Sequence, residues 1–598
     1  MRFGCLYVAN NVARTIDVVN ISRPTKPVKV GTINLAAKGA TAVLSVAAKD
    51  GLVAIGTSMT SAQANGRVFF TNTDGKFLSS AATGIEVGSQ PRDLEFSPDG
   101  RYVLSANQGQ PSSYCKTSGA LPTTTDPNGS VSIIDVSTNT PSAATTVNFE
   151  SFNDRTGALV YQGGRVFGPG ATLAQDLEPT SITLSSNSKY AYVTMAANNV
   201  MATIDMGSKT VISLAGFGQR DFSKSGFGLD AVVDSVASVK NQTAYGLYQP
   251  LDAATLVGSD GTNYVVTANG GAPRSYPCLM GGTSPTTVEN ESAALSSVYD
   301  PADSTITTVK NTIGGLQVTP FAPANPQVVA ISASTKVTKA YAFGSRSFSV
   351  WQPDNLDGVA VATQVWDSGE SVENVTAAAH PAQFNAGWNT TTGTINAADT
   401  LSTGSGAQPS AVATGSAYGL QWLAVGLKGD GGVMLYDASN PLAPTYFDYS
   451  NKMVVTGNIV SGKTAATAGD VSPESITFVS PAESPTGSAL LLVSYSGSGT
   501  VGIFEIPSNV PSAPRQVAAK LAAGKLTVKF AAPASRGWGS SLSYKVACKS
   551  TKGSVSATAD ASPVSIDVPA SKRGRAFACS VRALSSFGSG PAATAIVK

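Results

Sequence analysis

The sequence predicts an all-β protein: a β-propeller of seven or eight blades followed by a small β-sandwich. Two observations lead to this prediction. A short apolar strand, a small polar turn and a second strand ending in Asp or Glu form a unit that recurs eight times before residue 507. Charged residues make up only 13% of the 598 residues, about half of the ~25% usual in soluble domains. The surface must therefore be covered largely by Ser, Thr, Asn and Gly, which is common in exported all-β proteins.

Each repeat has the pattern of a β-hairpin, because β-branched residues alternate on both sides of a turn that contains Gly or Asn. The hairpins begin at Leu6, Leu52, Tyr102, Tyr190, Tyr264, Ala340, Trp422 and Leu490, and the partner strand of the third begins after an insertion, at Gly129. Repeated four-stranded units of this kind form a propeller, in which each blade buries its faces against its neighbours. The motif count predicts eight blades; seven result if the first and last hairpins share a blade and so close the ring.

Long insertions separate some of the strands. The segments around 107–130, 145–178, 270–295 and 380–410 are rich in Gly, Ser, Thr and Pro. We expect them to be loops gathered on the propeller faces, where binding and catalytic residues usually lie.

The pattern changes after the predicted propeller, which spans 1–507, and a short linker, 508–513. Residues 514–598 contain seven short alternating strands, which fits a β-sandwich. This segment resembles a fibronectin type III domain in Pro514, Tyr544, Phe577, Val581 and the stretch SSFGSGPAA, whereas Phe530 stands where that family usually has a tryptophan.

Charge is divided unevenly between these two parts. Residues 508–598 carry 13 basic and 2 acidic side chains, a net charge of +11, and the first 507 residues carry 27 basic and 36 acidic ones, a net charge of −9. Such asymmetry favours binding to a polyanion or docking onto an acidic surface; a soluble module that is merely basic is the alternative. The predicted basic patch consists of Arg515, Lys525, Lys529, Arg536, Lys545, Lys549, Lys572, Arg573, Arg575 and Arg582.

Several common classes of protein are excluded. No apolar run approaches the ~18–20 residues needed to cross a bilayer, and the single histidine, His380, excludes His-rich zinc sites. No P-loop, GxSxG, HExxH or EF-hand loop occurs. The stretch from Met1 to Asn10 shows no signal peptide, so we expect either a truncated start or an omitted leader.

Ordered motifs across about 500 residues resemble the choice-of-anchor I family, extracellular propellers with YVTN- or WD40-like repeats that are related to mesenchyme-specific cell surface glycoprotein. The matching stretches are SPDGRYVLSANQGQPSSY ending at Tyr114, DLEPTSITLSSNSKYAYVTMAANNVMATIDM from Asp176, GFGLDA from Gly226, GLYQPLDAATL from Gly246, YVVTANGGAPRSY ending at Tyr276, WDSGESVENVTAA from Trp366, GGVMLYDASNP from Gly431 and PESITFVSPAESPTGSALLLVSYSGSGTVGIFEI from Pro473. The resemblance implies a bacterial, exported protein tethered by a C-terminal module. Some members carry phytase-, phosphatase- or esterase-like labels.

The face loops depart from the family in their charge. Members usually have carboxylates where this chain has the amides Gln108 and Gln110. Ca²⁺ needs about six to eight oxygen ligands, several of them carboxylates. This chain therefore fits a calcium-dependent phosphatase less well than other members of the family do, and we predict no cofactor. The remaining acidic residues in matched motifs are weak metal candidates, with capping of loop amides as the alternative: Asp176, Glu178, Asp230 and Glu474.

We predict two disulfides among five cysteines, none of which forms a CxxC pair. Cys548 and Cys579 fall on neighbouring strands of the predicted sandwich. Cys115 follows Tyr114 and Cys278 lies two positions after Tyr276, so a disulfide between them would join two loops of the same motif type.

These observations favour an exported surface or extracellular binding scaffold without catalytic residues. The predicted binding residues of the face loops are Asn107, Gln108, Gln110, Tyr114, Asp176, Glu178, Asn269, Arg274 and Tyr276. The basic module would dock onto an envelope polyanion, another surface protein or a neighbouring subunit, without specific recognition of nucleic acid. The alternative is a secreted, metal-dependent phosphoesterase with its site on the propeller face.

Overall fold

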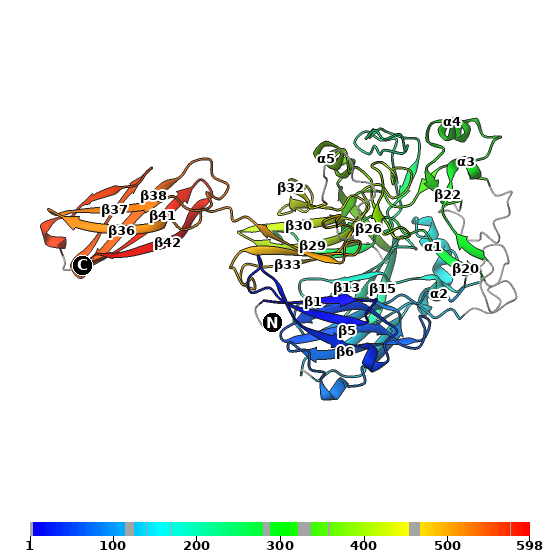
Figure 1. Cartoon of the computed structure of the whole chain (residues 1–598). Helices are drawn as coiled ribbons and strands as arrows, with labels where there is room; N and C mark the ends of the chain where they lie inside the picture. The colour runs from blue at the N-terminus through cyan, green and yellow to red at the C-terminus, as the bar shows by residue number, and fades with distance from the viewer. Residues whose placement is uncertain are drawn as a thin grey trace.

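Seven antiparallel sheets of three or four strands each follow one another between Cys5 and Ile506 in the computed structural model (Figure 1). The structure describes residues 4–113, 125–138, 140–168, 170–278, 287–320, 336–356, 359–453, 467–573 and 576–597. The strands of the first four sheets are β1 (Cys5–Asn10), β2 (Thr15–Asn20) and β3 (Val28–Asn34); β4 (Ala42–Lys49), β5 (Leu52–Ser58), β6 (Asn65–Asn72) and β7 (Ile85–Ser89); β8 (Pro91–Phe96), β9 (Tyr102–Asn107), β10 (Ser130–Asp135) and β11 (Thr145–Asn148); and β12 (Ser181–Leu184), β13 (Tyr190–Met195), β14 (Val200–Asp205) and β15 (Thr210–Gly216). Those of the last three are β18 (Asp252–Val257), β19 (Asn263–Ala268), β25 (Phe348–Leu356) and β26 (Val359–Asp367); β29 (Pro409–Ala417), β30 (Leu420–Leu427), β31 (Gly432–Asp437) and β32 (Thr445–Asn451); and β33 (Pro473–Val479), β34 (Ala489–Tyr495) and β35 (Thr500–Ile506).

The sheets are arranged as a ring. From β4 onward, the first strand of each sheet contacts the first strand of the next: β4 with β8, β8 with β12, β12 with β18, β18 with β29, and β29 with β33. The last sheet packs on the first, because Val479, Leu490 and Leu492 form one apolar cluster with Leu6 and Val19. Radial antiparallel sheets joined in a closed circuit are the arrangement of a β-propeller.

The predicted strand motifs correspond to strands of this ring, with one difference in how they pair. The motifs at Tyr264 and Ala340 do not form two hairpins: β19 and β25 pair with each other in a single sheet. The first and last hairpins lie in separate sheets. The chain between β19 and β25 instead contributes β22 (Ala293–Ala294), β23 (Gln317–Val318) and β24 (Tyr341–Ala342) to a small separate sheet. Its other two strands come from the segment before β18, namely β16 (Gln219–Asp221) and β17 (Tyr245–Leu247).

The long insertions all begin and end at one edge of the ring. In a four-stranded antiparallel sheet, the connection from the second to the third strand and the connection to the next sheet lie at the same edge. The segments 108–129, 149–180, 217–251, 269–347, 368–408 and 452–472 are connections of these two kinds. We call this edge the loop face. Its helices are α1 (Thr156–Tyr161), α2 (Leu173–Asp176), α3 (Leu295–Val298), α4 (Ser304–Ile313) and α5 (Ser371–Ala379).

The C-terminal module is a sandwich of two sheets, β36–β37–β40 and β39–β38–β41–β42. Residues from both sheets share one apolar core, including Val528, Tyr544 and Val581. The strands are β36 (Arg515–Ala522), β37 (Lys525–Ala531), β38 (Ser543–Ser550), β39 (Gly553–Ala559), β40 (Val564–Asp567), β41 (Phe577–Ser585) and β42 (Gly588–Val597). The predicted disulfide between Cys548 and Cys579 is confirmed, and the two residues stand opposite each other on β38 and β41.

The module leaves the ring at the edge opposite the loop face. Because β33 begins at the loop face and the next two strands reverse direction in turn, β35 ends at the other edge. Figure 1 shows the module projecting as an arm, with α3, α4 and β20 (Ser275–Cys278) on the far side of the ring. Trp538 of the module packs against the ring, its indole lying 5.7 Å from that of Trp422 and 5.0 Å from the ring of Phe447.

No helix in the described part of the chain is long and apolar enough to span a bilayer.

Candidate functional site

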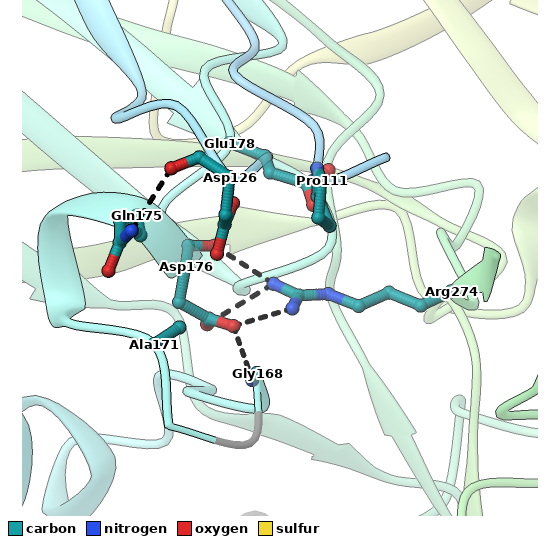
Figure 2. A pocket seen from close by; sticks show the side chains of 8 residues that line it. All are labelled: Pro111, Asp126, Gly168, Ala171, Gln175, Asp176, Glu178 and Arg274. Atoms are coloured by element: carbon teal, nitrogen blue, oxygen red, sulfur yellow. Dashed lines mark hydrogen bonds and ion pairs between the residues drawn. The ribbon is translucent and has the colours of Figure 1, made fainter. Parts of the chain in front are cut away.

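Three of the predicted face loops converge on one small pocket of the loop face. Its lining residues are Pro111, Asp126, Gly168, Ala171, Gln175, Asp176, Glu178 and Arg274. Figure 2 shows the guanidinium of Arg274 reaching toward Asp176 from the segment before β20, with Asp126 and Glu178 beside it. The cavity volume is about 10 Å³, which is room for about one water molecule and far below the ~300–1,000 Å³ of typical small-molecule sites.

Helix α2 positions the acidic residues of the pocket. Thr172 caps the helix: its side chain accepts from the Gln175 backbone N–H, and the Gln175 side chain accepts from the Thr172 N–H in return. This capping box satisfies amides at the start of a very short helix and fixes Asp176 as its last residue. Gly129 lets the neighbouring loop approach, because any side chain there would collide with the Leu177 carbonyl oxygen.

The Asp176 carboxylate is fully engaged by protein donors. Arg274 binds it through Nη1 at 2.6 Å and Nη2 at 3.2 Å, and both side chains are buried. The backbone N–H groups of Phe167 and Gly168 donate to it at 3.1 and 2.6 Å, and Asn198 Nδ2 donates at 2.9 Å. A buried carboxylate needs this degree of compensation to remain charged.

Glu178 and Gln108 meet in the same region. Gln108 Nε2 donates to Glu178 Oε2 at 3.3 Å, and the Glu178 backbone N–H donates to Asn198 Oδ1 at 3.0 Å. A carboxylate at position 108 would instead place two acceptors against each other. The amide of Gln108 therefore supplies a hydrogen-bond donor that a carboxylate could not supply.

Asp126 is a residue that the sequence analysis did not single out. Its Oδ1 atom is buried and has no hydrogen-bond partner among the described residues. Burial, and next the neighbouring Asp176 carboxylate, raise the pKa of Asp126 to about 7. The Glu178 carboxylate adds to this rise, and the Arg274 guanidinium opposes it. Asp126 was not identified because the residues that perturb it lie about 50 to 150 positions away in the chain.

Other predicted binding residues lie inside the sheets. Asn107, at the end of β9, donates through Nδ2 to the hydroxyls of Ser130 and Ser132 at 3.2 and 2.9 Å. Asn269, just after β19, repeats the arrangement, because its Nδ2 donates to Ser349 Oγ at 2.7 Å. Both asparagines are buried. The repeated Ser/Thr–x–Asn ending of these strands thus has a structural use in joining the second strand to the third.

The remaining predicted loop residues are partly described. Gln110 and Gln90 bond reciprocally, since Gln90 Oε1 accepts from the Gln110 N–H at 2.9 Å and Gln90 Nε2 donates to Gln110 Oε1 at 3.2 Å. Tyr114 and Cys115 lie outside the described residues. Tyr276 and Cys278 belong to β20, but their side chains are also outside the described part, so the predicted disulfide between Cys115 and Cys278 stays a prediction.

Asp230 and Glu474, the other two weak metal candidates, lie in hydrogen-bond networks separate from that of Asp176 and Glu178. Asp230 accepts from the N–H groups of Val232 and Ser238 at 3.2 and 2.8 Å. Glu474 pairs with Lys428 at 2.7 Å on the surface. In the described ranges, no group of three or more His, Cys, Asp or Glu side chains is arranged to hold a metal ion.

The donor set around Asp176 does not fit Ca²⁺. The guanidinium of Arg274 already supplies a cation to this carboxylate, and the amide of Gln108 points a donor at Glu178. A calcium ion needs six to eight converging oxygens, whereas these two groups present N–H donors.

Buried arginine–carboxylate pairs recur across the loop face and were not foreseen. Arg165 is paired with Glu291, which also accepts from Thr319 Oγ1 at 2.8 Å and from the Arg274 N–H at 3.1 Å. Further pairs are Arg346 with Glu373 at 2.8 Å and Arg220 with Asp367 at 3.5 Å. The partners are far apart in sequence, so no local motif reveals them. Most of these pairs join one insertion to another, and the pair of Arg220 with Asp367 joins an insertion to the ring strand β26.

The residues of the predicted basic patch are distributed along the module. Arg515 and Arg536 lie near the ring, at the start of β36 and in the loop that carries Trp538. Lys529, Lys545 and Arg582 are exposed on strands. The others lie toward the end far from the ring, namely Lys525, Lys549, Lys572 and Arg573, and Arg575 is outside the described residues.

Comparison with known proteins gives one family and several distant structures. The family model of the choice-of-anchor I domain matches residues 2–441. Gigasin-3a of Magallana gigas is 26% identical over 170 residues, a match that spans 28% of this chain and 58% of Gigasin-3a.

Solved structures resemble the chain at low identity. The periplasmic gluconolactonase PpgL of Pseudomonas aeruginosa is 11% identical, with 87% of this chain and 99% of that chain covered and a TM-score of 0.32. The β-propeller domain of Cps50 (Swd1) from Myceliophteria thermophila is 8% identical, with 84% and 93% covered and a TM-score of 0.35. Values this low transfer no activity to this chain.

Proposed function

Because this chain belongs to the choice-of-anchor I family, we propose that it is an exported surface or extracellular binding protein, with a propeller that engages a partner through the loop face and a basic module that attaches to an anionic envelope polymer. The match to part of Gigasin-3a supports an extracellular setting. The succession of seven sheets supports a seven-bladed propeller, and the two-sheet module with its seven strands supports the fibronectin type III assignment.

One observation supports the attachment role: charged side chains have ion-pair partners within the propeller, but not within the described part of the module. In the propeller, buried carboxylates are matched by arginines and backbone amides. In the described part of the module, no lysine or arginine forms an ion pair with a carboxylate. The module has a net charge of +11, and positive charge that has no internal ion pair among its described residues attracts an external polyanion.

The test is binding of the full chain to immobilised dextran sulfate, with uncharged dextran as the reference surface. We expect retention on the sulfated polymer alone, with affinity that falls steeply between 50 and 500 mM NaCl, because screening shortens the reach of exposed charges. Equal retention on both polymers, or binding that does not change with salt, would contradict the proposal.

A hydrolytic role is the second candidate, and Asp126 is the observation that favours it. A carboxyl with a pKa of about 7 beside an arginine has the proton affinity of a general base at neutral pH. Hydrolysis of p-nitrophenyl phosphate that Asp126→Asn abolishes, while Asp154→Asn leaves it intact, would support this role. If the wild type does not hydrolyse this substrate either with or without added Ca²⁺, the hydrolytic role is ruled out.

A further inference from the structure

The positive charge of the module is concentrated at the end far from the ring. Three segments meet there: the turn between β36 and β37, the turn between β38 and β39, and the short 3₁₀ helix η4 (Ala570–Lys572). They carry five cations, which we call the cationic tip: Lys525, Lys549, Lys552, Lys572 and Arg573.

Contacts between the segments hold the tip together. Ser550 Oγ donates to the Lys572 carbonyl at 3.1 Å, and Lys572 Nζ donates to the Ser554 carbonyl at 3.1 Å. The Val568 N–H donates to the Gly524 carbonyl at 2.9 Å. Gly524 is needed at this turn, because it has a φ of 79° and any side chain there would collide with the Arg573 guanidinium. The cations therefore project from connected backbone.

All five cations of the tip are exposed. The acidic residue in these segments is Asp567, which stands opposite Lys525 in the strand register without an ion pair to it in the described structure. Asp560 follows β39, at the other end of the module. Like charges gathered on one surface repel one another, and a bound anion relieves that repulsion.

The side chains at the tip indicate the kind of anion. Four of the five are lysines, whose compact charges on flexible stems suit anionic groups at irregular positions, in contrast to the fixed bidentate geometry of arginine. The tip segments 522–525, 549–553 and 570–573 contain, besides these cations, Ser, Thr, Ala and Gly and no aromatic side chain. Proteins that bind single-stranded nucleic acid use aromatic platforms on which bases stack. The tip thus favours a polymer without bases.

The propeller of a second copy is a poorer match for the tip. Some of its surface carboxylates are already paired, as Asp17 is with Lys29 and Glu474 is with Lys428. Others cap turns, as Asp205 does for Ser208 and Asp221 does for Ser223.

We propose that the cationic tip is the attachment site of the module and that its ligand is a linear acidic polysaccharide. This inference rests on the proposed attachment function and locates it. An extended polymer with an anionic group on each repeat can contact several lysines of the tip at once, so binding depends on the number of cations at this end of the module.

The experiment compares two full-length variants with the same loss of charge. The tip variant carries Lys549→Ser, Lys552→Ser and Lys572→Ser; the matched control carries Lys520→Ser, Lys529→Ser and Lys545→Ser, at exposed strand positions of the same module. Binding to dextran sulfate is measured at several NaCl concentrations. Thermal unfolding of both variants is recorded, and Lys549→Arg/Lys552→Arg, which keeps the charge, serves as a second reference.

We expect the tip variant to bind at least tenfold more weakly than the wild type and with a shallower dependence on salt, because fewer counterions are released. The control is expected to lose about threefold or less, and the Lys→Arg variant to bind as the wild type does.

Equal loss in the tip and control variants would overturn the tip as the site while leaving attachment to polyanions intact. A wild type that does not bind at all would instead overturn the proposed function. Stronger binding to single-stranded DNA than to dextran sulfate would contradict the polysaccharide assignment. Salt-sensitive dimers in sedimentation velocity, lost in the tip variant, would point to a second copy of the chain.

Discussion

Single residues on the loop face show how the chain keeps charge inside the protein. Asp176 is held by one guanidinium, two backbone amides and one carboxamide. Removing one partner of such a buried pair leaves the other charge uncompensated, which costs more than the pair itself contributes.

Arg274→Met is therefore expected to destabilise the propeller by about 3–5 kcal/mol. Lys428→Met, which breaks the exposed pair with Glu474, is the control and should cost about 1 kcal/mol or less. Urea unfolding followed by circular dichroism measures both. Equal urea midpoints for the two variants would contradict this expectation, because the buried pair of Arg274 with Asp176 would then contribute no more to stability than the exposed pair does.

The donor role of Gln108 gives a second test. Gln108→Glu turns a donor to Glu178 into a second carboxylate, so we expect a lower melting temperature at pH 8 that recovers at pH 5, where one of the two carboxyls holds a proton. Gln421→Glu keeps the side-chain oxygen that accepts from Ser416 Oγ at the surface and should change the melting temperature little. Equal losses in both variants would contradict this account.

The sequence located part of this site. Gln108, Asp176 and Arg274 were selected from three separate motifs, and the structure brings their loops to one pocket. Asp126 and Glu291 could not be foreseen, because their roles depend on charges contributed by distant insertions.

At the scale of strands and turns, sequence patterns predicted strand pairing correctly where the two strands are neighbours in the sequence. Alternation and turn residues located the hairpins, but nothing local shows that β19 pairs with β25 across an insertion of about 80 residues. A further local signal precedes the first strands of the sheets, which contact one another around the ring and are therefore its innermost strands. Several of them follow a Gln–Pro or Ser–Pro step, in which the first residue has positive φ: Gln90 at 53°, Gln249 at 44°, Gln408 at 53° and Ser472 at 63°.

The innermost strands also make stability depend on pH. Burial, and next the Asp93 carboxylate, raise the pKa of Asp252 on β18 to about 7. Unfolded carboxyls titrate near pH 4. Between these values the folded state binds more protons than the unfolded state, so its stability falls as pH rises.

We therefore expect the melting temperature of the propeller to fall between pH 5 and pH 8. Asp252→Asn should make this fall smaller, whereas Glu505→Gln, at an exposed position of β35, should leave it unchanged. Calorimetry at several pH values measures the effect, and a rising melting temperature over this range would rule out the explanation.

The disulfide of the module gives a prediction at the same scale. Cys548 and Cys579 close a loop with a sequence separation of 31, for which loop entropy corresponds to about 3–4 kcal/mol. Replacing both by serine should lower the unfolding transition of the module accordingly, as dithiothreitol should in the wild type. Cys5→Ser is the control, since Cys5 is free, and an equal effect there would contradict the assignment.

For the whole molecule, the contact between arm and ring rests on aromatic side chains. Trp538 touches Trp422 and Phe447 of the ring and, within the module, Phe587 at 5.7 Å. Trp538→Ala should free the arm and broaden the distribution of distances in small-angle X-ray scattering. Phe587→Ala removes a contact inside the module and should leave the scattering unchanged. Identical scattering from Trp538→Ala and the wild type would show that the linker alone determines the orientation of the module relative to the ring.

The ring separates the edge where the chain leaves for the arm from the edge that carries the insertions. A molecule held by the far end of its arm turns the insertions toward the surrounding medium. Those insertions can grow, shrink or change in sequence without disturbing how the molecule is held. One means of attachment can then serve many different specificities, and variation among relatives should concentrate in the insertions.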